Sequence, residues 1–529
     1  MYARLGETSI HLFRLTAEGQ YDNGDFRSLR SKDMSFPSFL AFDLGAASGR
    51  AIIGHLEAGR LRTKELYRFT NAMLPVQEHL HWDIFRLFEE IKTGLRISVQ
   101  EARIASVAVD TWGVDFGLLD KDGAVLGMPF AYRDAHTQGA MEEFFRLVPQ
   151  EKIYNLTGIQ FLPFNSLFQL YAMKKNKSPV LEEARDLLFM PDLFQYFLTG
   201  KKKTEFTFAT TSQLYNPRKK GWESELFAAL TIPMSLMQEI IQPGTFVGKL
   251  DKKIARQLGL RDVRVVAVAS HDTGSAVVSV PAQGEDWAFI SSGTWSLMGV
   301  ETGAPIINDL ALRLNFTNEG GAGGTFRVLK NITGLWLLQK CREAWEAEKK
   351  ISYDFDTLMA MAQEAESLRF FIDSDWEGFL NPVDMPQAIQ EYCTRTEQEP
   401  PGSHAELVRG ICESLALKYR AVLDEIRQIR TTPIRKIHVI GGGAKNRLLC
   451  QFTANATGLP VFAGPAEATS IGNIMMQSLA HGYIQSLGQM REVIRNSFDV
   501  AEYEPSQTKE WQKAYERFQK ILLTELNDA

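Results

Sequence analysis

The fold is decided by the stretch FLAFDLGAASGRAIIGHL, residues 39–56, in which two apolar runs flank the turn DLGAASGR. Both runs have the length of a strand, and their low polar content is typical of strands covered on both faces. A second stretch, WAFISSGTWSLMGV at 287–300, repeats this pattern with small and hydroxyl-bearing residues in its turn. The repetition predicts two domains, each of which opens on a strand–loop–strand hairpin.

The rest of the chain alternates strand-like and helix-like patterns. Apolar runs at 104–113, 263–270 and 436–443 are further strand candidates, and 83–102 and 405–429 are long amphipathic helix candidates. This alternation indicates α/β layers instead of a β-sandwich or a helix bundle.

Proline and glycine punctuate the chain at VPAQGED, 280–286, where we place the domain boundary. The predicted segments are an N-terminal extension at 1–33, an N-terminal domain at 34–281, a C-terminal domain at 282–500 and a C-terminal helical tail at 501–529.

Composition and charge exclude several classes of function. The 529 residues include 58 Lys and Arg against 64 Asp and Glu, and the net charge of −6 gives no general attraction to nucleic acid or anionic lipid. The four cysteines have no C-x-x-C spacing, which predicts buried thiols in a reducing cytosol. No apolar run approaches the roughly 18 residues of a membrane helix. We therefore expect a cytoplasmic protein that acts on small molecules, with no nucleic acid or membrane partner.

Three glycine-containing loops are candidate phosphate sites. In DLGAASGR the small residues allow backbone N–H groups to approach a polyanion, Arg50 adds a cation, and Asp43 suits a bridging Mg²⁺. SSGTWSLMG offers hydroxyl donors, among them Thr294, and IGGGAKN at 440–446 offers three consecutive glycines. Each loop is also compatible with an ordinary tight turn. The chain has neither the P-loop nor the G-x-G-x-x-G pattern, so both of those nucleotide folds are excluded.

Two further motifs follow predicted strands. SHDTGS at 270–275 places Asp272 at the carboxyl end of a strand, where α/β proteins hold catalytic groups, although a helix-capping role explains it equally well. VDTWGVDF at 109–116 places Trp112 and Gly113 where they suit either a sugar-binding wall or a buried tryptophan corner.

The order of these motifs, DLGAASGR, DTWGVDF, SHDTGS, SSGTWS, NITGLWLLQ and IGGG, resembles that of the carbohydrate kinases of the glycerol kinase and xylulose kinase family, in the actin and sugar-kinase superfamily. The resemblance runs from about Phe36 to about Asp499. It implies two actin-like (ribonuclease H-like) α/β domains with a central nucleotide and sugar cleft.

The resemblance also implies roles for particular residues. Asp272 would be the catalytic proton acceptor, and Asp43 and Asp272 would lie near Mg²⁺. Residues implied to bind ATP are Ala46, Ala47, Ser48, Gly49, Arg50, Thr294, Gln339 and Gly442. Residues implied to bind the sugar are Gly113, His271, Asp272, Thr273 and Asn331.

Within the family, GIQFLPFNSLFQL at 158–170 and TNEGGAGGTFRVLKNITGLWLLQ at 317–339 are similar to the subfamily that acts on L-rhamnulose. The resemblance implies an ATP-dependent enzyme that phosphorylates the 1-hydroxyl of this ketose, as a monomer or homodimer. Two alternatives stay open: a kinase of another ketose, such as L-fuculose or xylulose, and a non-catalytic ATP-dependent switch.

Overall fold

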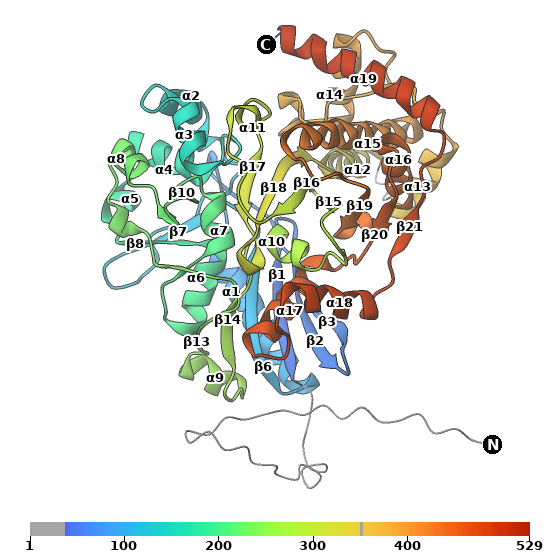
Figure 1. Ribbon diagram of the computed structural model, residues 1–529. Coiled ribbons are helices and arrows are strands. Elements are labelled where there is room, and N and C mark those ends of the chain that lie inside the picture. Colours follow the sequence, from blue (N-terminus) through green and yellow to red (C-terminus); the bar gives the residue numbers. More distant parts are fainter. Residues whose placement is uncertain (1–36, 350–352, 529) are drawn as a thin grey trace, which may run out of the picture. The chain divides into compact units, whose positions relative to one another are not determined.

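A computed structural model describes residues 37–349 and 353–528, and the extension predicted at 1–33 lies outside the described residues. The first of two large sheets has the strand order β13-β14-β6-β1-β2-β3 (Figure 1). As the turn DLGAASGR predicts, β1 (Ser38–Leu44) and β2 (Ser48–Glu57) form an antiparallel hairpin. The other strands are β3 (Arg60–Thr70), β6 (Ile104–Thr111), β13 (Thr245–Lys249) and β14 (Arg264–Ala267).

The second large sheet repeats this arrangement, with the order β17-β18-β16-β15-β19-β20-β21. Its central hairpin, β15 (Trp287–Ser292) and β16 (Trp295–Thr302), corresponds to β1 and β2. In both sheets the first hairpin strand pairs in parallel on its other side, with β6 or β19, and the second pairs antiparallel with β3 or β18. The remaining bounds are β17 (Thr317–Gly320), β18 (Phe326–Thr333), β19 (Lys436–Ile440), β20 (Val461–Ala463) and β21 (Ala501–Tyr503).

Helices cover both faces of the first sheet at its centre, which explains why β1 and β6 are almost continuously apolar and buried. On β1, Leu40 and Phe42 pack with α1 (Ile84–Glu101) and α6 (Met190–Thr199), whereas Phe39 and Ala41 belong to a cluster on the opposite face. Asp83 caps α1, because its side chain accepts a hydrogen bond from the Arg86 N–H.

Smaller elements join the strands of the first half. The helices are α2 (Ala140–Phe145), α3 (Gln150–Thr157), α4 (Ser166–Lys175), α5 (Pro179–Glu183), α7 (Phe206–Thr211), α8 (Ser224–Leu230), α9 (Lys252–Leu258) and α10 (Asp272–Val278). The short strands are β4 (Leu74–Val76), β5 (His79–His81), β7 (Phe116–Leu119), β8 (Asp186–Phe189), β9 (Thr204–Glu205), β10 (Tyr215–Asn216), β11 (Gly221–Trp222) and β12 (Ile240–Ile241).

The second half carries the longest helix, α15 (His404–Ile429), close to the predicted range of 405–429. The stretch 501–529, predicted as a helical tail, contains β21 of the second sheet followed by α19. The other helices of this half are α11 (Asp309–Arg313), α12 (Trp336–Lys349), α13 (Phe355–Glu364), α14 (Met385–Arg395), α16 (Arg447–Thr457), α17 (Ala468–Ala480), α18 (Leu487–Ser497) and α19 (Thr508–Asp528).

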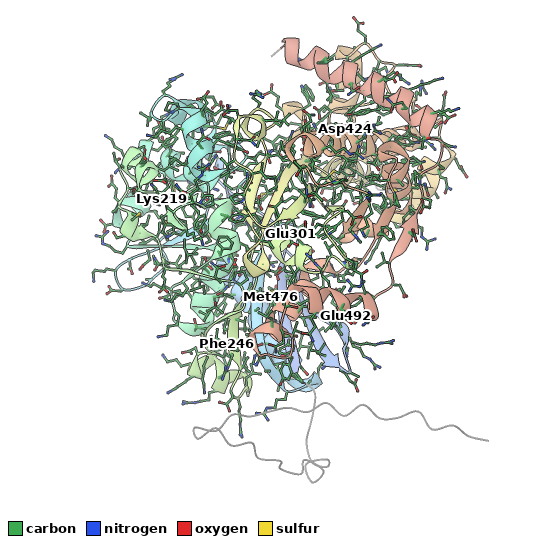
Figure 2. The ribbon with its side chains drawn as sticks, viewed as in Figure 1. Lys219, Phe246, Glu301, Asp424, Met476 and Glu492 are labelled. Atoms are coloured by element: carbon green, nitrogen blue, oxygen red, sulfur yellow. The ribbon has the colours of Figure 1, made fainter. Side chains whose placement is uncertain are left out.

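Helix α17 returns from the second half to the first sheet. Ile474, Met475 and Met476 of this helix join the apolar cluster that includes Phe39 of β1 and Phe246 of β13; Figure 2 labels Met476 and Phe246. Because α17 packs along α10 as well as against β1 and β6, it links the two halves of the chain.

The four cysteines are free and buried, as predicted. Over the described residues, no helix has both the length and the apolar character that crossing a bilayer requires.

Candidate active site

A cavity of about 300 Å³ is lined by residues from both sheets. The β1–β2 turn, the end of β6 and the start of α10 contribute from the first half, and the β15–β16 turn, β18 and the loop after β19 contribute from the second. All of the predicted site residues line it except Gly49 and Gln339: Asp43, Ala46, Ala47, Ser48, Arg50, Gly113, His271, Asp272, Thr273, Thr294, Asn331 and Gly442.

Gly49 and Gln339 contact other residues of the described chain. A Cβ on Gly49 would lie 2.3 Å from the Phe69 ring, so this glycine permits strand packing inside the first sheet. The Gln339 Oε1 accepts a hydrogen bond of 3.3 Å from Thr294 Oγ1, and Thr294 lines the cavity.

Strand register places three charged residues in one row. Asp43 on β1 lies opposite Arg50 on β2 and opposite Asp110 on β6. Arg50 donates from Nε to Asp43 Oδ2 at 3.0 Å and also forms an ion pair with Glu467. These two carboxylates, Asp43 foremost, raise the pKa of Arg50 despite its burial. Arg50 lines the cavity, and its positive charge is already paired with the carboxylates of Asp43 and Glu467.

Asp110 is fully buried, and its Oδ2 accepts a hydrogen bond of 2.5 Å from Asn473 Nδ2 of α17. Burial, with smaller contributions from the carboxylates of Asp43 and Asp272, raises the pKa of Asp110 well above its ordinary value. Of these three acids, Asp43 and Asp272 line the cavity.

Asp272 is the first residue of α10, and the backbone N–H and Oγ1 of Thr273 donate to its Oδ1 at 2.5 and 3.1 Å. Its side chain keeps 32% of its surface exposed. Burial of the group raises the pKa of Asp272, and Asp43 adds to this rise while His271 opposes it. A carboxylate with a raised pKa that remains accessible is suited to accept a proton.

His271 connects this acid to a buried ion pair. Its Nε2 lies 3.4 Å from Asp272 Oδ1, and its Nδ1 lies 3.2 Å from both Glu319 Oε2 and Arg327 Nη2. Glu319 and Arg327 face each other across β17 and β18, 3.1 Å apart. Burial acts to raise the pKa of Glu319, but Arg327 and His271 outweigh it and hold this pKa below its ordinary value.

The cavity lining also contains apolar and aromatic groups. Trp112, Tyr132, Phe164 and Trp295 are among them, and the Phe164 and Trp295 rings lie 5.9 Å apart. Near them, the backbone N–H and Nδ2 of Asn331 both donate to Gln160 Oε1 at 3.0 Å. Gln160 belongs to the first half and Asn331 to β18, so this contact joins the two halves at the cavity.

The glycine loop after β19 approaches the β15–β16 turn closely. Gly441 has a φ of +82°, and a Cβ on Gly443 would lie 2.0 Å from Ser292 Oγ. A Cβ on Gly442 would meet no heavy atom of the described chain within 4 Å, and this residue lines the cavity. The open backbone at Gly442 can accept a phosphate group or a flat ring.

Among the described residues, no group of three or more His, Cys, Asp or Glu side chains could hold a metal ion. Asp43 and Asp272 both line the cavity, however. Mg²⁺ is usually bound through one or two carboxylates together with substrate phosphates. The donor set therefore fits an ion that arrives with a phosphate compound.

Sequence reasoning missed Gln160, Tyr132, Phe164, Trp295 and Glu319. Gln160 and Phe164 lie within GIQFLPFNS, a segment whose motif resemblance was recognised without a role for its residues. Glu319 lies in TNEG and Arg327 in FRVLKN, and the pairing of these two residues depends on the register of their strands, which the sequence does not give.

The family models of FGGY carbohydrate kinases match two stretches: the N-terminal domain matches residues 38–279, and the C-terminal domain matches 288–481. The chain belongs to the FGGY family of carbohydrate kinases, as the order of its motifs predicted.

Curated relatives cover almost the whole chain. A rhamnulokinase of Bacteroides thetaiotaomicron is 47% identical over 482 residues, which cover 91% of this chain and 98% of the relative. Rhamnulokinases of Pectobacterium carotovorum and Oceanobacillus iheyensis are 42% and 41% identical, and the matches cover 92% and 88% of this chain and 97% of each relative.

Solved structures confirm the predicted fold of two α/β domains. A gluconate kinase from Lactobacillus acidophilus matches with a TM-score of 0.75 at 16% identity, over 92% of this chain and 98% of that chain. A glycerol kinase from Plasmodium falciparum, solved with ADP, matches with a TM-score of 0.73 at 13% identity, over 92% and 98% of the two chains.

Proposed function

We propose that the protein transfers the γ-phosphoryl group of ATP to the 1-hydroxyl of L-rhamnulose, giving L-rhamnulose 1-phosphate and ADP. The observation that carries this proposal is the similarity, over about nine-tenths of the chain, to five curated relatives named rhamnulokinase at 41–47% identity. The cavity adds independent support, because it combines an accessible carboxylate, glycine-containing loops and an aromatic wall.

Asp272 is the proposed proton acceptor. The 1-hydroxyl oxygen attacks the γ-phosphorus, the bond from that phosphorus to ADP breaks, and Asp272 takes the hydroxyl proton. Phosphoryl transfer is loose, so the carboxylate mainly orients the hydroxyl and accepts its proton late. The raised pKa of Asp272 makes it a better base than a fully solvated aspartate.

His271 and Thr273 hold this base, since both contact Asp272 Oδ1. We propose that His271, Thr273, Gly113 and Asn331 also contact the sugar, as the family resemblance implies. Asn331 would do so from a fixed position, because Gln160 accepts both of its N–H groups.

For ATP, we propose phosphate contacts from Ala46, Ala47 and Ser48 of the β1–β2 turn and from Thr294, with the backbone at Gly442 beside the nucleotide. Gln339 would position Thr294, and Gly49 would support the turn by packing. Asp43 and Asp272 would hold Mg²⁺ together with the phosphates, and the ion would neutralise charge on the phosphate oxygens.

A coupled assay of ADP release tests the reaction and the substrate together. The panel is L-rhamnulose, L-fuculose, L-xylulose, D-xylulose, D-fructose and glycerol, each with Mg-ATP. We expect L-rhamnulose to give the highest kcat/KM by about tenfold, a margin of about 1.4 kcal/mol. A different best ketose would change the substrate, and slow ATP turnover that no sugar stimulates would favour the switch.

We also propose that the enzyme is cytoplasmic and acts as a monomer or homodimer. Fractionation of expressing cells and light scattering of the purified protein test these two statements.

A further inference from the structure

Asp115 is a buried acid directly behind the cavity wall. It is fully buried, and four donors surround its carboxylate. Oδ2 accepts from Trp82 Nε1 at 2.6 Å, Trp112 Nε1 at 2.9 Å and the Tyr132 backbone N–H at 3.1 Å. Oδ1 accepts from Gln169 Nε2 at 2.9 Å. Two of these neighbours, Trp112 and Tyr132, line the cavity.

The backbone before Asp115 forms a tight turn that directs its carboxylate toward Trp112. Val114 has a φ of +65°, which is rare for a β-branched residue and strained. The Asp115 N–H donates to the Gly113 carbonyl at 2.9 Å, and Ser166 Oγ donates to the Val114 carbonyl at 2.5 Å. These contacts hold the chain in a tight reversal that brings the carboxylate of Asp115 back to the Trp112 indole. Strain of this kind persists where the surroundings enforce it, often beside functional sites.

The Asp115 carboxylate also determines whether the indole N–H groups beside the cavity can bind a ligand. Both indole N–H groups, of Trp82 and Trp112, are already paired with Asp115. The two rings lie 4.1 Å apart, so Trp82 supports Trp112 from behind. The Trp112 side chain therefore presents carbon to the cavity, beside the apolar side chains of Val114, Ile159 and Leu162.

We propose that Asp115 is a positioning residue that holds the apolar wall formed by Trp112, Val114, Ile159 and Leu162. This wall would make the sugar site selective for a 6-deoxyketose over the ketose that carries a 6-hydroxyl. This inference rests on the proposed function. Trp112 and Val114 flank Gly113 and line the same cavity as Asp272, so a sugar whose 1-hydroxyl faces Asp272 can place its methyl group against this apolar wall.

The size of the selectivity follows from the cost of burying a hydroxyl. A hydroxyl placed against an apolar surface loses its hydrogen bonds to water without gaining others. A hydrophobic pocket discriminates against an added hydroxyl by at most roughly 10². We therefore expect wild-type kcat/KM to be about 10- to 100-fold higher for L-rhamnulose than for L-fructose, which differs from it only by the 6-hydroxyl.

The test compares this ratio of kcat/KM values in the wild type and in Asp115→Asn. An asparagine has one acceptor oxygen, and its NH₂ group would face a donor, so at least one of the four N–H groups around this side chain loses its partner. We expect the ratio to fall at least fivefold, with a higher KM for L-rhamnulose and a kcat within about threefold of wild type, because Asp115 does not line the cavity and so does not touch the reacting atoms.

Two further variants keep the inference testable if Asp115→Asn folds poorly. Trp82→Phe removes a donor to Asp115 without touching the cavity, because Trp82 is fully buried behind Trp112 and does not line it; we expect a smaller fall of the ratio in the same direction. Glu413→Gln is the matched control. It alters a buried carboxylate of the second half that bonds to Arg409, and the ratio should stay at its wild-type value.

An unchanged ratio in both Asp115→Asn and Trp82→Phe overturns the inference, and so does an equal change in Glu413→Gln. Failure of the proposed function is a separate result: wild-type enzyme would then prefer another ketose of the panel, whatever the variants do.

Discussion

Gly472 of α17 gives the sharpest test of how the site is held together. A Cβ at this position would lie 1.8 Å from the Ser275 carbonyl oxygen of α10, where real contacts are essentially never under 3.0 Å. In Gly472→Ala the two helices must therefore separate by about 1.2 Å or more, because the obstacle is backbone and cannot rotate away. Overpacking of this kind costs about 1–3 kcal/mol of stability.

This separation would also displace the acids of the cavity. Helix α10 begins with Asp272, while on α17 Asn473 donates to Asp110 and Ser470 donates to Asp43 at 3.4 Å. A misplacement of about 1 Å can lower a rate about 10²-fold. We therefore expect Gly472→Ala to lower kcat at saturating ATP and sugar by about 10- to 100-fold, measured by coupled ADP release, and to lower Tm.

The matched control is Gly303→Ala. Its Cβ would meet no heavy atom of the described chain within 4 Å, and its φ lies outside the left-handed region, so Tm and kcat should stay near wild type. The reasoning is refuted if Gly472→Ala keeps kcat within threefold of wild type while remaining folded.

Four further predictions follow from the same geometry. Asp272→Asn should lower kcat by at least about 10² with sugar affinity by calorimetry nearly unchanged, and because burial raises the pKa of Asp272 above its ordinary 3.8, wild-type kcat should fall as the pH drops through that raised value. Burial raises the pKa of Glu205 from 4.5 to about 7. Between these pH values the folded chain binds a proton that the unfolded chain lacks, so the stability of the fold falls as the pH rises. Glu205→Gln should flatten this slope of Tm against pH. Arg133 of the first half lies 4.0 Å from the Trp336 ring of the second half and donates to the Leu380 carbonyl there, so it joins the two halves that line the cavity. Arg133→Ala should therefore raise KM for sugar and ATP about three- to tenfold, and unchanged values would show that this contact is dispensable. Removing Mg²⁺ with EDTA should weaken ATP binding more than tenfold by calorimetry, and equal affinity with and without the metal would contradict the proposed role of Asp43.

Local patterns made the hairpins and the principal strands and helices predictable, because a continuous apolar run with a small-residue turn has few other stable outcomes. The close packing of Gly49 against Phe69 could not be found in this way. A glycine that lets a backbone approach phosphate and a glycine that makes room for the Phe69 ring look the same in a sequence. The packing of α17 on the first sheet could not be predicted either, because the sequence of 468–480 does not indicate which of the two sheets its apolar face will contact.

The ion pairs of the site could not be predicted from the sequence either, because they also depend on packing between distant parts of the chain. Each charged residue of the site can be seen in the sequence, but its partner is set by register or by long-range packing. Arg50 ends the turn DLGAASGR, where the sequence predicts a cation beside phosphate, but the sequence does not show that it forms ion pairs with Asp43 and with Glu467, which is far along the chain.

This pairing of Arg50 bears on how the cavity meets a nucleotide. The charged Asp, Glu, Lys and Arg side chains among its described lining residues are the carboxylates of Asp43, Asp272 and Glu319 and the guanidinium of Arg50. Glu319 is balanced by the buried Arg327, and Arg50 is balanced by Asp43 and Glu467. Asp272 is then left with His271 and Thr273 as its neighbours, so bare phosphates that approach it meet a repulsive carboxylate. A cation that arrives with the phosphates and lies near Asp43 and Asp272 changes this repulsion into attraction. The same carboxylate that suits proton acceptance is therefore the physical reason to expect a metal–nucleotide complex, instead of the nucleotide alone, as the phosphoryl donor.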